Sequence, residues 1–250
     1  MRIISGGICE TGDRRENNQD HILYVNRKEA GHETGLFLVA DGMGGLAWGM
    51  ETSGYIVQEF LRWWEQDVSW MFAYGKTSDE DILELLDQEI WDINQEILKF
   101  TRETGQRTGS TLSLLFIMDG KYYIKHLGDS RIYRSHADRI RQITEDQTTV
   151  QKVRRRSGEE YYKSVLTMCI GIPEIPEAYT MVGTLSSEDC FLLCSDGLYK
   201  CLKFERIQEI LQETDLNPEE TVWKLRHAIP DGDALDNVSA IVVRVSEECE

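Results

Sequence analysis

The sequence predicts an α+β fold in which antiparallel β-sheets have their helices grouped outside them. Strand-like runs follow one another closely, and Asp119-Gly120 between two of them is a strong signal for a β-hairpin. The strand–helix alternation that builds parallel sheets is absent, and the helical patterns come in two groups. Without a low-complexity linker or an internal repeat, and with only four prolines, residues 1–250 are predicted to form a single domain.

The predicted strands are short apolar runs bounded by polar or turn-forming residues. They fall at residues 22–26, 36–40, 111–118, 121–127, 131–135, 190–194 and 238–245.

The predicted helices show apolar residues at helical spacing. Ser78 is suited to cap the second helix, and Pro218 is suited to the first turn of the fourth. The four segments are 51–64, 78–100, 204–213 and 218–228.

Composition narrows the classes of function. A hydrophobic content of 41% allows a sizeable core, and a formal net charge of -17 argues against a nucleic-acid partner. The basic run at 152–156 is interpreted as a solvated loop, with contact to a phosphorylated partner as the alternative. No apolar run suits a signal peptide or a membrane span, so we expect a cytoplasmic protein with no membrane partner. The six cysteines lack a CxxC pair and are interpreted mostly as core residues.

Four aspartates lie in tight contexts flanked by glycine or asparagine. Asp41, Asp196 and Asp236 stand at the ends of apolar runs, and Asp129 lies in Gly128-Asp129-Ser130. Carboxylates gathered at such positions repel one another, and a shared hard cation is the simplest remedy. Oxygen-only ligation favours Mg²⁺ or Mn²⁺, which predicts a metal-assisted hydrolase. The alternative is that each aspartate is an ordinary turn residue.

Six motifs in a fixed order extend this pattern. They are the 15–20 segment, the 41–45 loop, Gly109-Ser110-Thr111, the 128–131 turn, the 195–197 turn and Asp236-Asn237. Over residues 6–245 the chain resembles the metal-dependent protein serine/threonine phosphatases of type 2C, the PPM family, in a compact form similar to bacterial members.

The resemblance implies a four-layer αββα sandwich, in which two antiparallel sheets are flanked by helix pairs and a metal cluster lies at one end. It further implies roles for particular residues. Asp41 would bridge two metal ions, and the Gly42 carbonyl would ligate one of them. Asp196 and Asp236 would complete the shell of the first ion, and Asp20 would serve the second ion directly or through water. Asp129 with Asp196 would hold a weaker third ion, and Arg15 would bind the substrate phosphate.

Each implied role has a chemical reason. Two Mn²⁺ or Mg²⁺ ions about 3.5–4 Å apart lower the pKa of a bridging water, and the resulting hydroxide can attack phosphorus in line. Arg15 suits phosphate because its planar guanidinium binds two oxygens at once. Arg15 and Asp41 are therefore the predicted catalytic residues, whereas Asn237 and Ser130 are interpreted as residues that position others.

The chain departs from the family at several positions. Gln19 stands where many eukaryotic members have a glutamate ligand, and Met43 replaces a histidine proposed as a general acid. Gln147 replaces a usual histidine or aspartate, and the 148–166 segment is shorter than the flap of bacterial relatives. None of these changes removes a core metal ligand.

The leading hypothesis is a monomeric phosphatase acting on phosphoserine and phosphothreonine in the substrates of a serine/threonine kinase. Two alternatives stay open. One is a catalytically weak relative that binds phosphoproteins. The other is a phosphatase of small phosphate esters or of phosphotyrosine.

Overall fold

The computed structural model describes residues 1–247 except for 30, 44–47, 75–77, 138 and 155–158. Several residues singled out above lie outside the described part: Gly44 and Gly45 of the 41–45 loop, Arg155 and Arg156 of the basic run, and Cys249.

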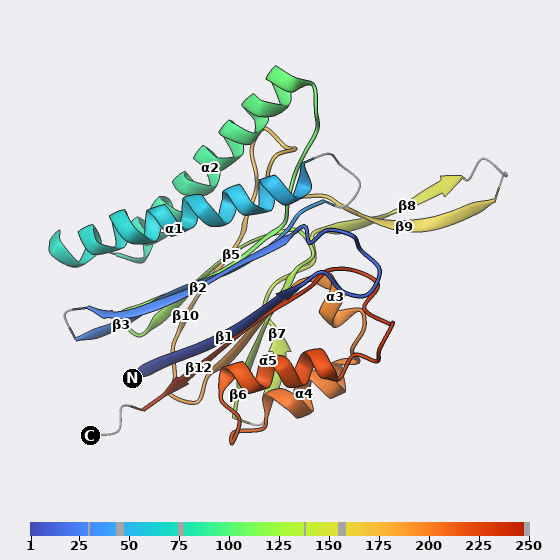
Figure 1. Ribbon diagram of the computed structural model, residues 1–250. Helices are drawn as coiled ribbons and strands as arrows, with labels where there is room; N and C mark the ends of the chain where they lie inside the picture. The colour runs from blue at the N-terminus through green and yellow to red at the C-terminus, as the bar shows by residue number, and fades with distance from the viewer. Residues whose placement is uncertain (30, 44–47, 75–77, 138, 155–158, 248–250) are drawn as a thin grey trace.

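Two five-stranded sheets stack face to face, and every pair of neighbouring strands in them is antiparallel (Figure 1). The first sheet contains, in spatial order, β1 (Arg2–Glu10), β12 (Val238–Ser246), β11 (Cys190–Cys194), β6 (Arg131–His136) and β7 (Arg139–Gln142). The second contains β10 (Tyr179–Thr184), β5 (Lys121–Leu127), β4 (Leu112–Met118), β3 (His32–Asp41) and β2 (Asp20–Glu29). A separate hairpin of β8 (Thr148–Arg154) and β9 (Glu160–Leu166) extends away from the sandwich.

Helices cover the two outer faces. The bounds are α1 (Gly49–Tyr74) and α2 (Asp79–Thr104) over the second sheet, and α3 (Asp196–Tyr199), α4 (Phe204–Leu211) and α5 (Pro218–His227) over the first. The predicted αββα sandwich is therefore confirmed. Ser78 caps α2 as predicted, because its side chain accepts a hydrogen bond from the Asp81 amide. Among the described residues, no helix is long and apolar enough to cross a bilayer.

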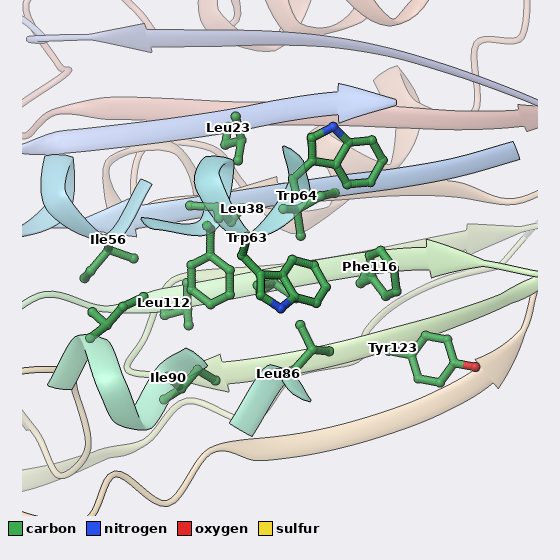
Figure 2. Close-up of a cluster of buried hydrophobic side chains, with 14 of the residues drawn as sticks. Leu23, Leu38, Ile56, Trp63, Trp64, Leu86, Ile90, Leu112, Phe116 and Tyr123 are labelled. Carbon is green, nitrogen blue, oxygen red and sulfur yellow. The ribbon is translucent and has the colours of Figure 1, made fainter. Parts of the chain in front are cut away.

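Three layers of apolar side chains hold the sandwich together. The central layer lies between the sheets and includes Phe37 and Phe191, both fully buried. In the layer between the second sheet and its helices, the Trp63 and Phe116 rings meet edge to face at 5.4 Å (Figure 2). Each large side chain buried in this way contributes about 1.5–3 kcal/mol. The sheets are thus a rigid support for the loops at their ends.

The sequence missed β1, β7, β8, β9, β10 and the short α3. In β1, Gly6-Gly7 interrupts the strand pattern, and the reason for glycine is tertiary. A Cβ on Gly6 would lie 2.5 Å from the Glu219 backbone nitrogen, because the start of α5 packs directly against the strand. Both β8 and β9 are largely exposed, so they lack the alternation of buried and polar residues that predicts a strand.

Candidate metal centre

Four of the five predicted metal-binding aspartates lie at strand ends, two in each sheet. In the second sheet, Asp20 opens β2 and Asp41 closes β3, and the two residues are directly paired across the antiparallel ladder. In the first sheet, Asp196 follows β11 and Asp236 precedes β12, which are neighbouring antiparallel strands. Since one strand ends where its antiparallel neighbour begins, each sheet places its two carboxylates at one edge.

Two chain crossings between the sheets bring in the remaining predicted residues. The turn from β5 to β6 carries Asp129, and its Gly128 has a φ of 111°, a conformation that glycine adopts without strain. The crossing from β1 to β2 carries Arg15, whose Nη2 donates to Asp236 Oδ2 at 2.8 Å. The structure thus brings together all the residues that the sequence predicted for the site.

The carboxylates are close enough to perturb one another. The pKa of Asp41 is raised well above its usual range, first by burial and then by repulsion from the other four. Asp41 keeps part of its surface accessible to solvent, and protein atoms surround its carboxyl group. The four repelling groups are Asp20, Asp196, Asp129 and Asp236.

Asp20 gives the strongest sign that the cluster fits a cation. Its side chain is 2% exposed, and neither carboxylate oxygen has a hydrogen-bond partner among the described residues. Burial raises its pKa to about 6; the nearby Ser239 and Ser195 hydroxyls offset part of the rise without reaching full hydrogen-bond geometry. A buried carboxylate without donors is costly, and a hard divalent ion would satisfy it.

Gly42 follows Asp41 at the end of β3, and neighbouring backbone packs closely around it. Its amide donates to the Gln19 carbonyl at 2.9 Å. A Cβ at this position would lie 2.3 Å from the Gly49 carbonyl oxygen and 2.7 Å from that of Gln19, so backbone closes on Gly42 from both sides. Only glycine fits this position, and the carboxylates and carbonyl oxygens here are the donor set that Mg²⁺ and Mn²⁺ prefer.

Protein cations already pair with two of the carboxylates. Asp236 accepts from Arg15, and Asp196 forms an ion pair with Lys200 four residues further along. Burial lowers the pKa of Lys200, but the hydrogen bond to Asp196 and the fields of Asp129 and Asp41 raise it more. Among the described residues, no three histidine, cysteine or acidic side chains stand at the distances that would hold one ion. Two of the predicted ligand carboxylates are thus already paired with a protein cation.

Comparison with known proteins identifies the family. The sequence profile of Protein phosphatase 2C matches residues 12–228. The chain belongs to the protein phosphatase 2C family. It is 30% identical to the protein phosphatase PhpP of Streptococcus pneumoniae, over 96% of this chain and 97% of that protein. It is 28% identical to the serine/threonine phosphatase stp of Listeria innocua, over 81% of each chain.

A solved structure of PppA, described as a key regulatory component of T6SS in Pseudomonas aeruginosa, matches with a TM-score of 0.77. That alignment covers 98% of both chains at 26% identity. The catalytic domain of the phosphatase PstP, solved with two manganese ions, shares the fold at 23% identity, with a TM-score of 0.76 and coverage of 98% and 99%. The chain is accordingly a phosphoprotein phosphatase of a metal-dependent family.

Asn237 positions the loop that carries Arg15 in this phosphatase. Its Nδ2 donates to the carbonyls of Thr11 at 2.9 Å and Asn17 at 3.0 Å, and its Oδ1 accepts from the Gln19 amide at 2.9 Å. The side chain is almost fully buried. These bonds fasten the β1–β2 crossing to the start of β12, beside Asp236.

Thr111 is a positioning residue that the sequence did not reveal. Its Oγ1 accepts from the Asp41 amide at 3.0 Å and lies 2.9 Å from Ser130 Oγ in the turn of Asp129. It therefore links the end of β3, which carries Asp41, to the turn that carries Asp129. Lys200 was also missed; its i, i+4 spacing from Asp196 was the available signal.

The raised pKa of Asp20 predicts how the stability of the metal-free protein depends on pH. Folded Asp20 holds its proton up to about pH 6, whereas in the unfolded chain it has the model value of 3.8. The folded state therefore binds more protons between these values, and this group's contribution to the free energy of unfolding falls as pH rises. The loss is about 3 kcal/mol, complete above pH 6.

Asp20→Asn should remove this loss. Urea unfolding in EDTA at pH 4 and pH 7 is the measurement, and the difference between variant and wild type isolates Asp20 from the other carboxylates. We expect the variant to be the more stable of the two at pH 7, and Mn²⁺ to raise its melting temperature less. An equal pH dependence in both proteins would contradict the assigned environment of Asp20.

Proposed function

We propose that this phosphatase hydrolyses phosphoserine and phosphothreonine at the five-carboxylate cluster, using Mn²⁺ or Mg²⁺. In this proposal the ions would be held by the side chains of Asp20, Asp41, Asp196 and Asp236 and by the Gly42 carbonyl. Asp129 and Asp196 would hold a possible third ion. The observation that carries the proposal is the buried Asp20 carboxylate, which has no hydrogen-bond partner among the described residues and lies opposite Asp41 across the β2–β3 ladder.

The bound ions would lower the pKa of a shared water and so supply the nucleophile at neutral pH. The chain's own residues do the rest. Arg15 uses one N–H on Asp236, and its guanidinium has further donors for the equatorial phosphate oxygens. Asn237 and the β1–β2 crossing hold Arg15 at the edge of the cluster. Met43 carries no transferable proton, so the leaving serine or threonine oxygen would be protonated from water.

The natural substrates would be phosphoproteins made by a serine/threonine kinase. In support, the curated relatives are named as protein phosphatases and, for stp, as a serine/threonine phosphatase. That residues 1–250 act as one catalytic domain, and as a monomer, stay predictions.

Purified protein assayed on a phosphothreonine peptide and on p-nitrophenyl phosphate tests this function. We expect release from the peptide with Mn²⁺ or Mg²⁺ and none in EDTA. Release from the small ester alone would favour a different phosphate substrate. Binding of Mn²⁺ in calorimetry with no release from either compound would favour a phosphoprotein-binding relative and overturn the proposal.

Arg15→Ala should raise KM for the phosphopeptide about ten- to a hundredfold, because it removes charge-assisted hydrogen bonds to phosphate. The same variant should not weaken the binding of Mn²⁺. Asp236 loses a competing cation, so the Kd for Mn²⁺ should stay equal or fall. Steady-state kinetics and calorimetry measure the two quantities, and Arg15→Lys, which keeps the charge but not the planar fork, is the matched variant. Weaker Mn²⁺ binding with unchanged KM would contradict the assigned role.

A further inference from the structure

A groove opens between the beginning of α1 and the last turns of α2. Its volume is about 370 Å³. Its walls are mainly aromatic and apolar, with two carboxylates among the lining residues: Trp48, Tyr55, Ile97 and Phe100, together with Glu51 and Glu96. The predicted function does not use it.

Trp48 lines this groove with its backbone in an unfavourable conformation. Its φ is 71°, a left-handed conformation that costs a non-glycine residue about 1–2 kcal/mol, and the residue is 45% exposed. The surrounding contacts fix it there. Its carbonyl accepts from Thr52 Oγ1 at 2.8 Å and Thr108 Oγ1 at 2.9 Å, its indole N–H donates to Gln106 Oε1 at 3.2 Å, and its ring meets Phe100 edge to face at 5.7 Å. The fold thus presents a rigid aromatic surface to solvent.

The two charged residues that line the groove are both acidic. Glu51 is exposed and forms no ion pair within the described part of the chain, while Glu96 pairs with Lys99 at 3.1 Å on the exposed helix surface. Aromatic faces beside carboxylates attract a cation and repel an anion. This chemistry is complementary to a lysine or arginine side chain.

The groove adjoins the metal centre through two backbone contacts. A Cβ on Gly42 would lie 2.3 Å from the carbonyl of Gly49, the residue after Trp48. Thr108, which bonds to Trp48, is three residues before Thr111, whose amide donates to the Asp41 carbonyl at 2.9 Å. Three residues of chain span at most about 11 Å. An extended peptide with its phosphate at Asp41 therefore reaches the groove about three residues away.

We propose that this groove binds a lysine or arginine of the phosphoprotein substrate, about three residues from the phosphorylated position. The inference rests on the proposed phosphatase function and adds a sequence preference to it. A cation over the rings and beside Glu51 is bound equally in the ground state and the transition state, so the preference should appear in KM and not in kcat.

Phosphothreonine peptides that differ only in arginine or alanine, placed two to four residues before or after the phosphate, test the groove with the wild-type protein and Mn²⁺. We expect one arginine position to raise kcat/KM about five- to tenfold, and the gain to shrink in 0.5 M salt. Hydrolysis of all peptides at equal kcat/KM would overturn the groove while leaving the proposed function intact. Hydrolysis of none would overturn the function itself.

Matched variants then locate the preference. Trp48→Leu and Trp48→Phe both lose the indole N–H bond at the same backbone position, but only phenylalanine keeps an aromatic face. We expect the arginine-to-alanine ratio of kcat/KM to approach one in Trp48→Leu and in Glu51→Gln, and to persist in Trp48→Phe.

Glu84→Gln is the charge control, because Glu84 is exposed and lies twelve residues before Glu96 on α2, about 18 Å along the axis. Glu84→Gln should keep the wild-type arginine-to-alanine ratio of kcat/KM. A ratio that survives in Trp48→Leu and Glu51→Gln would place the preference outside the groove. A ratio that falls equally in Glu84→Gln would assign it to overall charge. Either result would overturn the proposal that the groove binds the basic residue.

Discussion

Asp41→Asn should lower phosphate release at least about a thousandfold without unfolding the protein. Asp41 lies opposite Asp20 on the neighbouring strand and is repelled by Asp129, so in the proposed arrangement it would be a central ligand of the ions. An amide loses the charge and one ligating oxygen. The same change removes a carboxylate whose charge is disfavoured by burial and by repulsion from four other carboxylates. The metal-free variant should therefore have a free energy of unfolding at least as large as that of the wild type. Steady-state kinetics with Mn²⁺ and melting temperatures in EDTA measure the two effects.

Asp119→Asn is the matched control for Asp41→Asn. Asp119 follows β4 at the far end of the same sheet and has a φ of 51°, a conformation that asparagine before glycine also favours. Its kcat and its melting temperature should match those of the wild type. Full activity of Asp41→Asn, or activity of that variant in EDTA, would refute the role of Asp41 and with it the proposed two-metal reaction.

Gly197→Ala should combine a loss of stability with a loss of activity. A Cβ at this position would lie 1.9 Å from the Asn237 carbonyl oxygen, so either α3 or the start of β12 must move. We expect a loss of about 3 kcal/mol, the upper range for forcing extra atoms into a packed site. Asp196 and Asp236 flank the displaced backbone, and a shift of about 1 Å in a reacting group costs about a hundredfold in rate. Urea unfolding and kcat at saturating Mn²⁺ measure both.

Gly54→Ala separates this steric effect from helix propensity. Gly54 also lies within a helix, where alanine is favoured by about 1 kcal/mol. The atoms nearest to its Cβ would belong to the His21 ring, at 3.3 Å and beyond, and a side chain can move where backbone cannot. We expect this variant to keep its activity and to stay within about 1 kcal/mol of wild type. Equal behaviour of the two variants would show that the close approach of Gly197 to Asn237 is not a constraint.

The elements that the sequence predicted are those with a buried face or a local terminus signal. Each predicted strand lies largely within an observed strand, because the apolar runs are the parts of the strands that pack in the core. Ser78 and Pro218 marked the starts of α2 and α5 because caps act within a few residues. Conversely, β1 was missed because the contact of Gly6 with α5 involves residues far apart in the chain.

The fold class, the family and the aspartates at the strand ends could be predicted from the sequence, because periodicity, turn chemistry and motif order are local properties of the chain. Only the tertiary structure paired Asp20 with Asp41 across the ladder, placed Lys200 on Asp196, and made Thr111 and Asn237 the links that hold the centre. It also formed the acidic, aromatic groove from the ends of two helices. These features depend on how separate segments pack, and packing is set by the summed contacts of the whole core and by no single segment.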